Sequence, residues 1–137
     1  MCIICDNTYN INITYLYIKN CNNIITIPKN LINLKKIKIE NCKNILEIPK
    51  EFINLESLKI IKCDNFSIIP KELTKLSKIY IHYFNKVWYI PTSINLLKAL
   101  QFDYNPPNNP TMYLYSNNYL EIKKIINFIN NNYTIKP

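Results

Sequence analysis

Residues 34–54 read LKKIKIENCKNILEIPKEFIN, and residues 55–75 repeat the pattern as LESLKIIKCDNFSIIPKELTK. The apolar residues that open successive copies are Ile13, Leu34, Leu55, Leu76 and Leu97. Each of these residues lies 21 positions after the one before it, since 34 − 13, 55 − 34, 76 − 55 and 97 − 76 all equal 21. A fixed period of this length indicates a solenoid, in which each unit packs against its neighbours. The repeat therefore decides the fold of most of the chain.

Further columns follow the same period. Position 4 of the repeat is apolar in Leu16, Ile37, Leu58, Ile79 and Leu100. Position 6 holds Ile18, Ile39, Ile60, Ile81 and Phe102, and position 9 holds Cys21, Cys42, Cys63, Phe84 and Asn105. Four units continue to an Ile-Pro pair at positions 15 and 16. The consensus is L-x-x-L-x-I-x-x-C-x-x-I-x-x-I-P-x-x-L-x-N.

Apolar residues at positions 4 and 6 predict a strand with one buried face, because side chains alternate sides along extended backbone. Copies stacked about 4.8 Å apart would form a parallel sheet with a continuous core. The Pro cannot donate a backbone hydrogen bond, so it lies outside this sheet, at the turn into an outer segment. We expect that outer segment to be a 3₁₀ or one-turn helix.

This consensus resembles the leucine-rich repeat family, whose units follow L-x-x-L-x-L-x-x-N/C-x-L. The resemblance covers residues 13–105 and is closest to short, stand-alone proteins of AT-rich protists and giant DNA viruses. It implies an α/β fold: a right-handed solenoid with a parallel sheet on its concave face and short 3₁₀ or helical outer segments. It also implies a protein-interaction scaffold, without specifying a ligand.

The two ends depart from the repeat. Residues 1–12 are expected to be an imperfect N-terminal cap, which leaves the first strand edge near Tyr15 open to pairing with a second copy. Residues 13–105 comprise four complete repeats and a fifth strand unit, which Pro106, Pro107 and Pro110 are expected to end. Residues 106–137 are expected to be a C-terminal cap, with a helix near 118–130 covering the end of the core.

The composition excludes several classes of protein. The chain has 137 residues, no Gly and a formal net charge of +8, from 17 Lys+Arg and 9 Asp+Glu. Without Gly, neither Gly-rich type of phosphate loop can form. No apolar run is long enough to span a membrane, and the N-terminal sequence does not resemble a signal peptide. Five Cys without export indicate reduced thiols in a cytoplasmic compartment, or in the host cytoplasm or virion if the protein is viral.

The cysteines allow a metal or structural interpretation. Thiols stacked at position 9 could bind a soft metal. However, Phe84 and Asn105 continue that column without a thiol, and the resemblance implies an inward side chain that bonds to backbone. We therefore expect structural roles for Cys21, Cys42, Cys63, Phe84 and Asn105. The single Cys2-x-x-Cys5 pair lacks the second pair of a zinc site, so no metal or cofactor is expected.

The outward residues of the strands form the candidate interaction surface, which is rich in Lys and Tyr. Together with the aromatic residues of the fourth repeat it comprises Tyr15, Tyr17, Lys36, Lys38, Lys59, Lys78, Tyr80, His82, Tyr83, Trp88 and Tyr89. Trp88 and Tyr89 are expected in a loop at the sheet edge, where Trp88 either contacts a partner or folds over Phe84. The lysines fit either an acidic protein partner or AT-biased codon use that leaves the face solvated.

Catalysis is not expected, because the single His82 has Asp103 as a neighbour but no nucleophile. The predicted function is a non-catalytic scaffold that binds another protein through the Lys/Tyr face. Two alternatives remain open. The face could bind a polyanion or nucleic acid, although Arg is absent from the chain. The protein could also be a self-assembling component of a larger particle.

Overall fold

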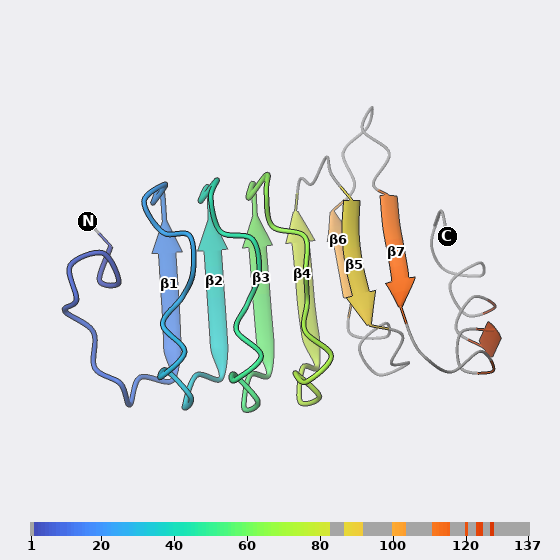
Figure 1. Ribbon diagram of the computed structural model, residues 1–137, viewed down its shortest axis with the longest axis horizontal. Helices are drawn as coiled ribbons and strands as arrows, with labels where there is room; N and C mark the ends of the chain where they lie inside the picture. The colour runs from blue at the N-terminus through green and yellow to red at the C-terminus, as the bar shows by residue number, and fades with distance from the viewer. Residues whose placement is uncertain are drawn as a thin grey trace.

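Each repeat contributes one short strand to a parallel sheet (Figure 1). In this computed structural model the described residues are 2–82, 87–91, 100–103 and 111–115, with Leu120, Lys123, Lys124 and Asn127. The five-stranded sheet has the order β1-β2-β3-β4-β6. Its strands are β1 (Tyr15–Lys19), β2 (Lys36–Glu40), β3 (Ser57–Ile61), β4 (Lys78–His82) and β6 (Leu100–Asp103).

The register of the sheet reproduces the period of the sequence. Ile18 pairs with Ile39, and Ile39 pairs with Ile60, so partners on neighbouring strands are one repeat period apart. The same offset joins Ile81 on β4 to Phe102 on β6. The predicted parallel solenoid is therefore confirmed, with about three complete turns between β1 and β4.

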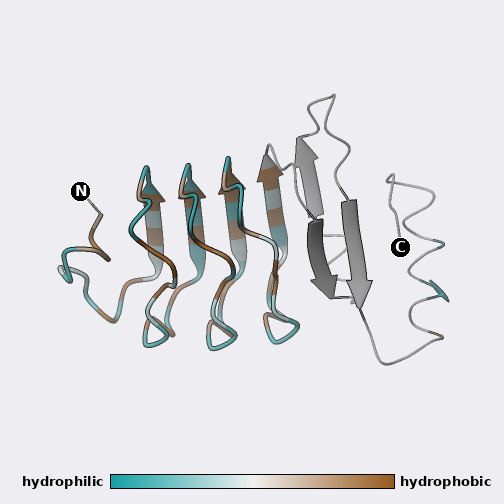
Figure 2. Cartoon of the chain, turned by 45° about the horizontal axis from the view of Figure 1, so that its top comes forward, coloured by the Kyte–Doolittle hydropathy of each residue, from teal (hydrophilic) through white to brown (hydrophobic). Residues whose placement is uncertain are grey.

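The core lies between the sheet and the segments that return the chain to the next strand. The residues at positions 4 and 6 of the first four strands are all buried, as predicted. Figure 2 shows the resulting hydropathy bands along these strands. From the return segments, Phe52 and Phe66 are fully buried against them. At the N-terminal end Ile4 is 8% exposed and closes the core, with Cys2 and Tyr9 packed beside it.

The return segments correct the prediction of 3₁₀ or one-turn helices, because those of residues 2–82 consist of separate turns and extended backbone. Leu31 N–H donates to Pro28 O, and Leu34 N–H donates to Leu31 O. These bonds are three residues apart, whereas a 3₁₀-helix needs them at successive residues. Backbone groups between the turns instead bond to the next coil, as in the Glu47–Ile68 bridge. The regular elements within residues 2–82 are all strands, so this part is a parallel β-solenoid, and it gives no support to the expected α/β class.

Asparagine side chains join consecutive coils outside the sheet. The Asn54 amide donates to Ile32 O at 3.1 Å, and the Asn65 amide donates to Lys43 O at 2.6 Å. Both bonds connect residues 22 positions apart, which is one coil plus one residue. Asn41 also donates to the side chain of Asn20 at 2.7 Å. These amides satisfy carbonyl groups that a helix would have satisfied internally.

Position 8 of the repeat is a left-handed turn that follows each of the first three strands. Asn20, Asn41 and Lys62 have φ angles of 55°, 52° and 53°. Left-handed backbone normally favours Gly, which this chain lacks, and Asn is the next best residue. Lys62 has a Cβ atom, unlike Gly, and it lacks the short hydrogen-bonding side chain of Asn. The position-8 residues thus shape the turn, in addition to lying at the rim of the outward sheet face.

The C-terminal part departs from the loop expected at Trp88 and Tyr89. Strand β5 (Val87–Pro91) contains Trp88 and Tyr89, which were predicted in a loop, and it pairs in parallel with β7 (Thr111–Tyr115). Val87 pairs with Thr111, an offset longer than the repeat period. Pro106, Pro107 and Pro110, which were expected to end the fifth unit, lie outside the described residues.

The capping helix expected near 118–130 falls largely outside the described residues. Leu120, at its predicted start, is exposed. Among the described residues there is no helix with the length and apolar character that crossing a membrane requires.

Replacing Lys62 by Asn tests the turn at position 8. Lys62→Asn is expected to raise the free energy of unfolding by about 1 kcal/mol, because it relieves left-handed strain and extends the Asn20–Asn41 ladder. Urea denaturation followed by circular dichroism measures the change. Lys43→Asn makes the same substitution at an exposed residue outside the set with positive φ. An equal gain in that control would contradict the explanation.

Candidate functional site

The outward face of the sheet is the interaction surface predicted from the sequence. On strands β1 to β4, residues at the same repeat position lie opposite one another and form a row across the face. Tyr15 and Tyr17 on β1 are 52% and 41% exposed. The outward lysines are spread over the four strands as Lys19, Lys36, Lys38, Lys59 and Lys78. Glu40 is the only acidic residue among the outward residues with described side chains on these strands. The described face therefore carries a formal charge of +4, from five lysines and one glutamate.

The central row of this face reads Tyr17, Lys38, Lys59 and Tyr80, each directly opposite the next. Lys38 and Lys59 are neighbours of like charge, which is unfavourable on adjacent strands. They lean in opposite directions. Lys38 Nζ lies 4.7 Å from the centre of the Tyr17 ring, and Lys59 Nζ lies 5.0 Å from that of Tyr80. The two cation–π contacts separate the charges and order four long side chains.

Glu40 is the centre of a polar network at the β1 end of the face. Tyr17 donates its hydroxyl to Glu40 Oε2 at 2.7 Å, and the ammonium groups of Lys19 and Lys38 each lie 3.9 Å from the carboxylate. The Tyr17 hydrogen bond, with these nearby lysines, lowers the pKa of Glu40 despite partial burial. The same hydrogen bond raises the pKa of Tyr17. Glu40 therefore neutralises part of the positive charge of this face.

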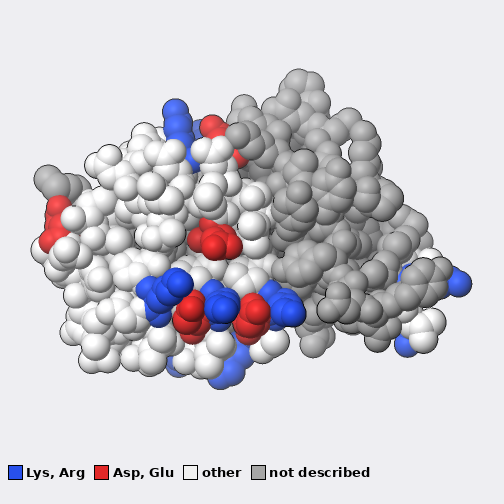
Figure 3. All heavy atoms as spheres, viewed as in Figure 1, with Lys and Arg blue, Asp and Glu red and all other residues white. Residues whose placement is uncertain are grey.

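The face formed by the return segments has a different charge pattern. Lys29, Lys50 and Lys71 occupy one repeat position there, and Glu51 and Glu72 occupy the next. Figure 3 shows Lys and Glu side chains alternating in one row across this side of the molecule. The return segments thus mix charges of both signs, whereas the outward sheet face is mainly positive.

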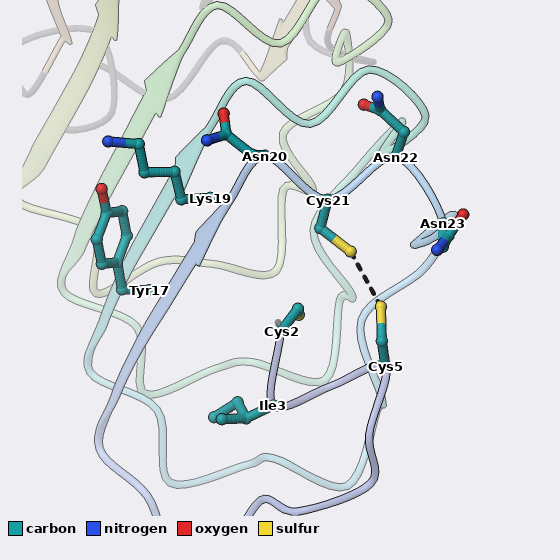
Figure 4. A pocket seen from close by; sticks show the side chains of 9 residues that line it. All are labelled: Cys2, Ile3, Cys5, Tyr17, Lys19, Asn20, Cys21, Asn22 and Asn23. Atoms are coloured by element: carbon teal, nitrogen blue, oxygen red, sulfur yellow. Dashed lines mark hydrogen bonds between the residues drawn. The ribbon is translucent and has the colours of Figure 1, made fainter.

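A second cluster lies at the N-terminal end, where three cysteines meet. The Sγ atoms of Cys2, Cys5 and Cys21 all lie within 4.8 Å of one another. Cys5 and Cys21 point toward each other with their sulfurs 2.9 Å apart (Figure 4). Burial opposes ionisation of Cys21, but hydrogen bonds from Cys5, from the backbone of Asn23 and from other neighbours outweigh it and lower its pKa. The hydrogen bond with Cys21 raises the pKa of Cys5.

The other two cysteines of the position-9 column are bonded to backbone. Cys42 Sγ donates to Glu40 O, and Cys63 Sγ donates to Ile61 O, both at 3.3 Å. Both thiols are buried, and burial raises the pKa of Cys63 to about 11. These are the contacts of structural thiols. Phe84 and Asn105, which were predicted to continue the column, lie outside the described residues.

Several other predicted site residues are described only in part. The backbone register places His82 opposite Asp103, as expected from the repeat. Trp88 and Tyr89 belong to strand β5 and pair with residues of β7, and Tyr83 lies outside the described residues. The structure therefore brings together the Lys and Tyr residues of β1 to β4.

The candidate residues taken from the sequence did not include Glu40, and sequence reasoning missed the thiol cluster. Glu40 occupies the same repeat position as Lys19, which marks it as a neighbour of that lysine on the adjacent strand. The thiol cluster had a weaker signal, because Cys2 and Cys5 precede the first repeat and nothing in the period places them beside Cys21.

Comparison of the chain with protein-family models, curated proteins and solved structures found no match.

The network around Glu40 predicts a pH-dependent effect of Glu40→Gln. Because folding lowers the pKa of Glu40, its charged form stabilises the protein above its ordinary pKa of 4.5, and this contribution is lost as the pH falls through the lower folded value. The variant should melt below the wild type at pH 7, and the difference should shrink as the pH falls through the lowered pKa of Glu40 and vanish below it. Thermal melts from neutral to acidic pH test it. Glu72→Gln, on the opposite face, is the control and should show no such pH-dependent difference.

Proposed function

We propose that this protein is a non-catalytic scaffold that binds another protein, and that the outward face of the five-stranded sheet is its binding surface. The observation that carries the proposal is the ordered Tyr17–Lys38–Lys59–Tyr80 row across four strands. Tyrosine supplies a large contact area at low entropic cost, which makes it a preferred contact residue. The excess of lysine favours a partner with an acidic surface.

The contacts within the row lower the entropic cost of binding. A free lysine loses considerable side-chain freedom when a partner immobilises it. Lys38 is already held by the Tyr17 ring and Glu40, and Lys59 is held by Tyr80. A partner therefore meets side chains that are largely in place. Their regular spacing, one strand apart, suits an extended acidic segment or a flat acidic surface.

We also propose that the repeats are leucine-rich repeats. The L-x-x-L-x-I-x-x-C consensus, the inward thiols and the parallel sheet with one strand per repeat support this assignment. The return segments of this chain consist of turns, whereas the resemblance implies 3₁₀ or helical segments there.

Charge reversal on the two faces provides a matched test of the binding surface. Lys36→Glu combined with Lys78→Glu alters two exposed residues of the outward face, and Lys29→Glu combined with Lys50→Glu makes the same change on the return segments. The first variant should capture on the order of tenfold less of the partner protein from cell extract, since like charges would then face each other. The second should capture as much as the wild type. Quantitative mass spectrometry compares the three captures.

The same proteins distinguish the two alternative functions. Binding to a nucleic-acid duplex that weakens steeply with salt, and that only the first variant loses, would indicate polyanion binding in place of a protein partner. Concentration-dependent sedimentation of the wild type alone would indicate self-assembly. Equal capture by both variants would show that the outward face is not the binding surface.

A further inference from the structure

The thiol cluster lies where the N-terminal segment meets the first coil. Cys2 and Cys5 belong to a tight turn in which Asp6 N–H donates to Cys2 O and Thr8 N–H donates to Ile3 O, both at 3.1 Å. Ile4, between the two cysteines, is buried in the core and anchors the turn. Cys21 follows β1 and its left-handed turn at Asn20. Three thiols from two separate parts of the chain are therefore brought to one place.

The geometry of the cluster suits a single metal ion. Thiolates bound tetrahedrally at about 2.3 Å from zinc lie about 3.8 Å from one another. Here the Cys5 and Cys21 sulfurs are 2.9 Å apart, and the three sulfurs lie within 4.8 Å of one another. Shifts on the order of 1 Å would bring all three to the required separation. Cys5 is exposed and Cys2 is half-buried, so rotation of their side chains can supply these shifts.

The surroundings of the cluster leave room for a further ligand. The three cysteines line a pocket of about 520 Å³, open to solvent, together with Tyr17, Lys19 and three asparagines. Among its described lining residues there is no carboxylate or imidazole, so a fourth ligand would come from solvent. Three thiolates with one divalent ion carry a net charge of −1, and Lys19 is the cation placed to balance it.

We infer that Cys2, Cys5 and Cys21 form a binding site for one soft, thiolate-preferring d¹⁰ cation, of which Zn²⁺ and Cu⁺ are the two candidates. Binding replaces the three thiol protons, which leave to solvent, by three sulfur–metal bonds. The ion joins the N-terminal turn to the first coil. It thereby fastens the segment that closes the core at the end of the sheet where β1 is the edge strand.

The hydrogen bond between Cys5 and Cys21 supports this inference. This contact holds the two sulfurs 2.9 Å apart, so two of the three proposed ligands are already neighbours. The remaining thiols of the described residues, Cys42 and Cys63, are buried and bonded to strand carbonyls, and they lie outside the cluster.

Titration of the reduced protein with Co²⁺, a spectroscopic substitute for Zn²⁺, tests the site. The expected result is one equivalent bound, with thiolate-to-cobalt charge-transfer absorption and the visible bands of tetrahedral cobalt. Addition of Zn²⁺ or Cu⁺ should abolish both signals, and the amount needed of each shows which ion binds more tightly. The bound Zn²⁺ or Cu⁺ should also raise the melting temperature, because only the folded chain holds the three thiols together.

Single substitutions show whether the three thiols are the ligands. Cys2→Ser, Cys5→Ser and Cys21→Ser should each weaken binding by more than the 10–100-fold that loss of an outer-shell partner typically costs. Cys42→Ala removes a thiol outside the cluster and should leave stoichiometry and spectrum unchanged. Cys5 is exposed, so Cys5→Ser remains informative even if the buried Cys21→Ser protein fails to fold.

Three results would overturn the inference. The reduced protein could bind none of Co²⁺, Zn²⁺ and Cu⁺, binding could persist unchanged in the exposed Cys5→Ser variant, or Cys42→Ala could reduce binding as much as Cys5→Ser does. Peroxide treatment of a protein that binds no metal, followed by mass spectrometry, would then show whether Cys5 and Cys21 are a disulfide-forming pair instead.

Discussion

The structure depends on the constant offset of one repeat period between neighbouring strands. Because partners such as Ile18, Ile39 and Ile60 pair at this offset, like side chains stack on like throughout the first four coils. The core receives only apolar residues, and the outward face receives only residues that tolerate water. A shift of one residue in a single coil would exchange the two faces of its strand, so the core and the outward face depend on the same register.

The absence of glycine makes asparagine a structural residue here. Asn20 and Asn41 adopt the left-handed turn after their strands, and Asn54 and Asn65 bond to carbonyl groups of the preceding coil. These asparagines recur at fixed repeat positions: Asn20 and Asn41 at position 8, Asn33 and Asn54 at position 21, and Asn44 and Asn65 at position 11. In the turns, Asn takes the place that Gly would normally occupy. In the return segments, Asn amides bond to carbonyl groups that a helix would satisfy internally.

The period of the sequence predicted the strands, their register and the buried face of the sheet, because all three follow from which residues recur once per repeat. It did not predict the turns of the return segments, since their hydrogen bonds go to neighbouring coils and depend on side chains such as Asn54. Strand β7 was missed because its offset from β5 is longer than the repeat period. The outward Lys and Tyr residues were predicted, whereas the thiol cluster depends on the fold of a segment outside the repeat.

The described N-terminal segment covers the end of the core beside β1 but does not pair with the edge of this strand. The N-terminal segment buries Ile4 against the core, yet among the described residues its backbone hydrogen bonds are local and none reaches β1. The outer edge of β1 therefore keeps backbone groups that can pair with another chain. Tyr15 and Tyr17, the exposed aromatic residues of the outward face, belong to this same strand. Under the proposal that this face binds a partner, contact with these tyrosines would bring that partner beside the open edge of β1.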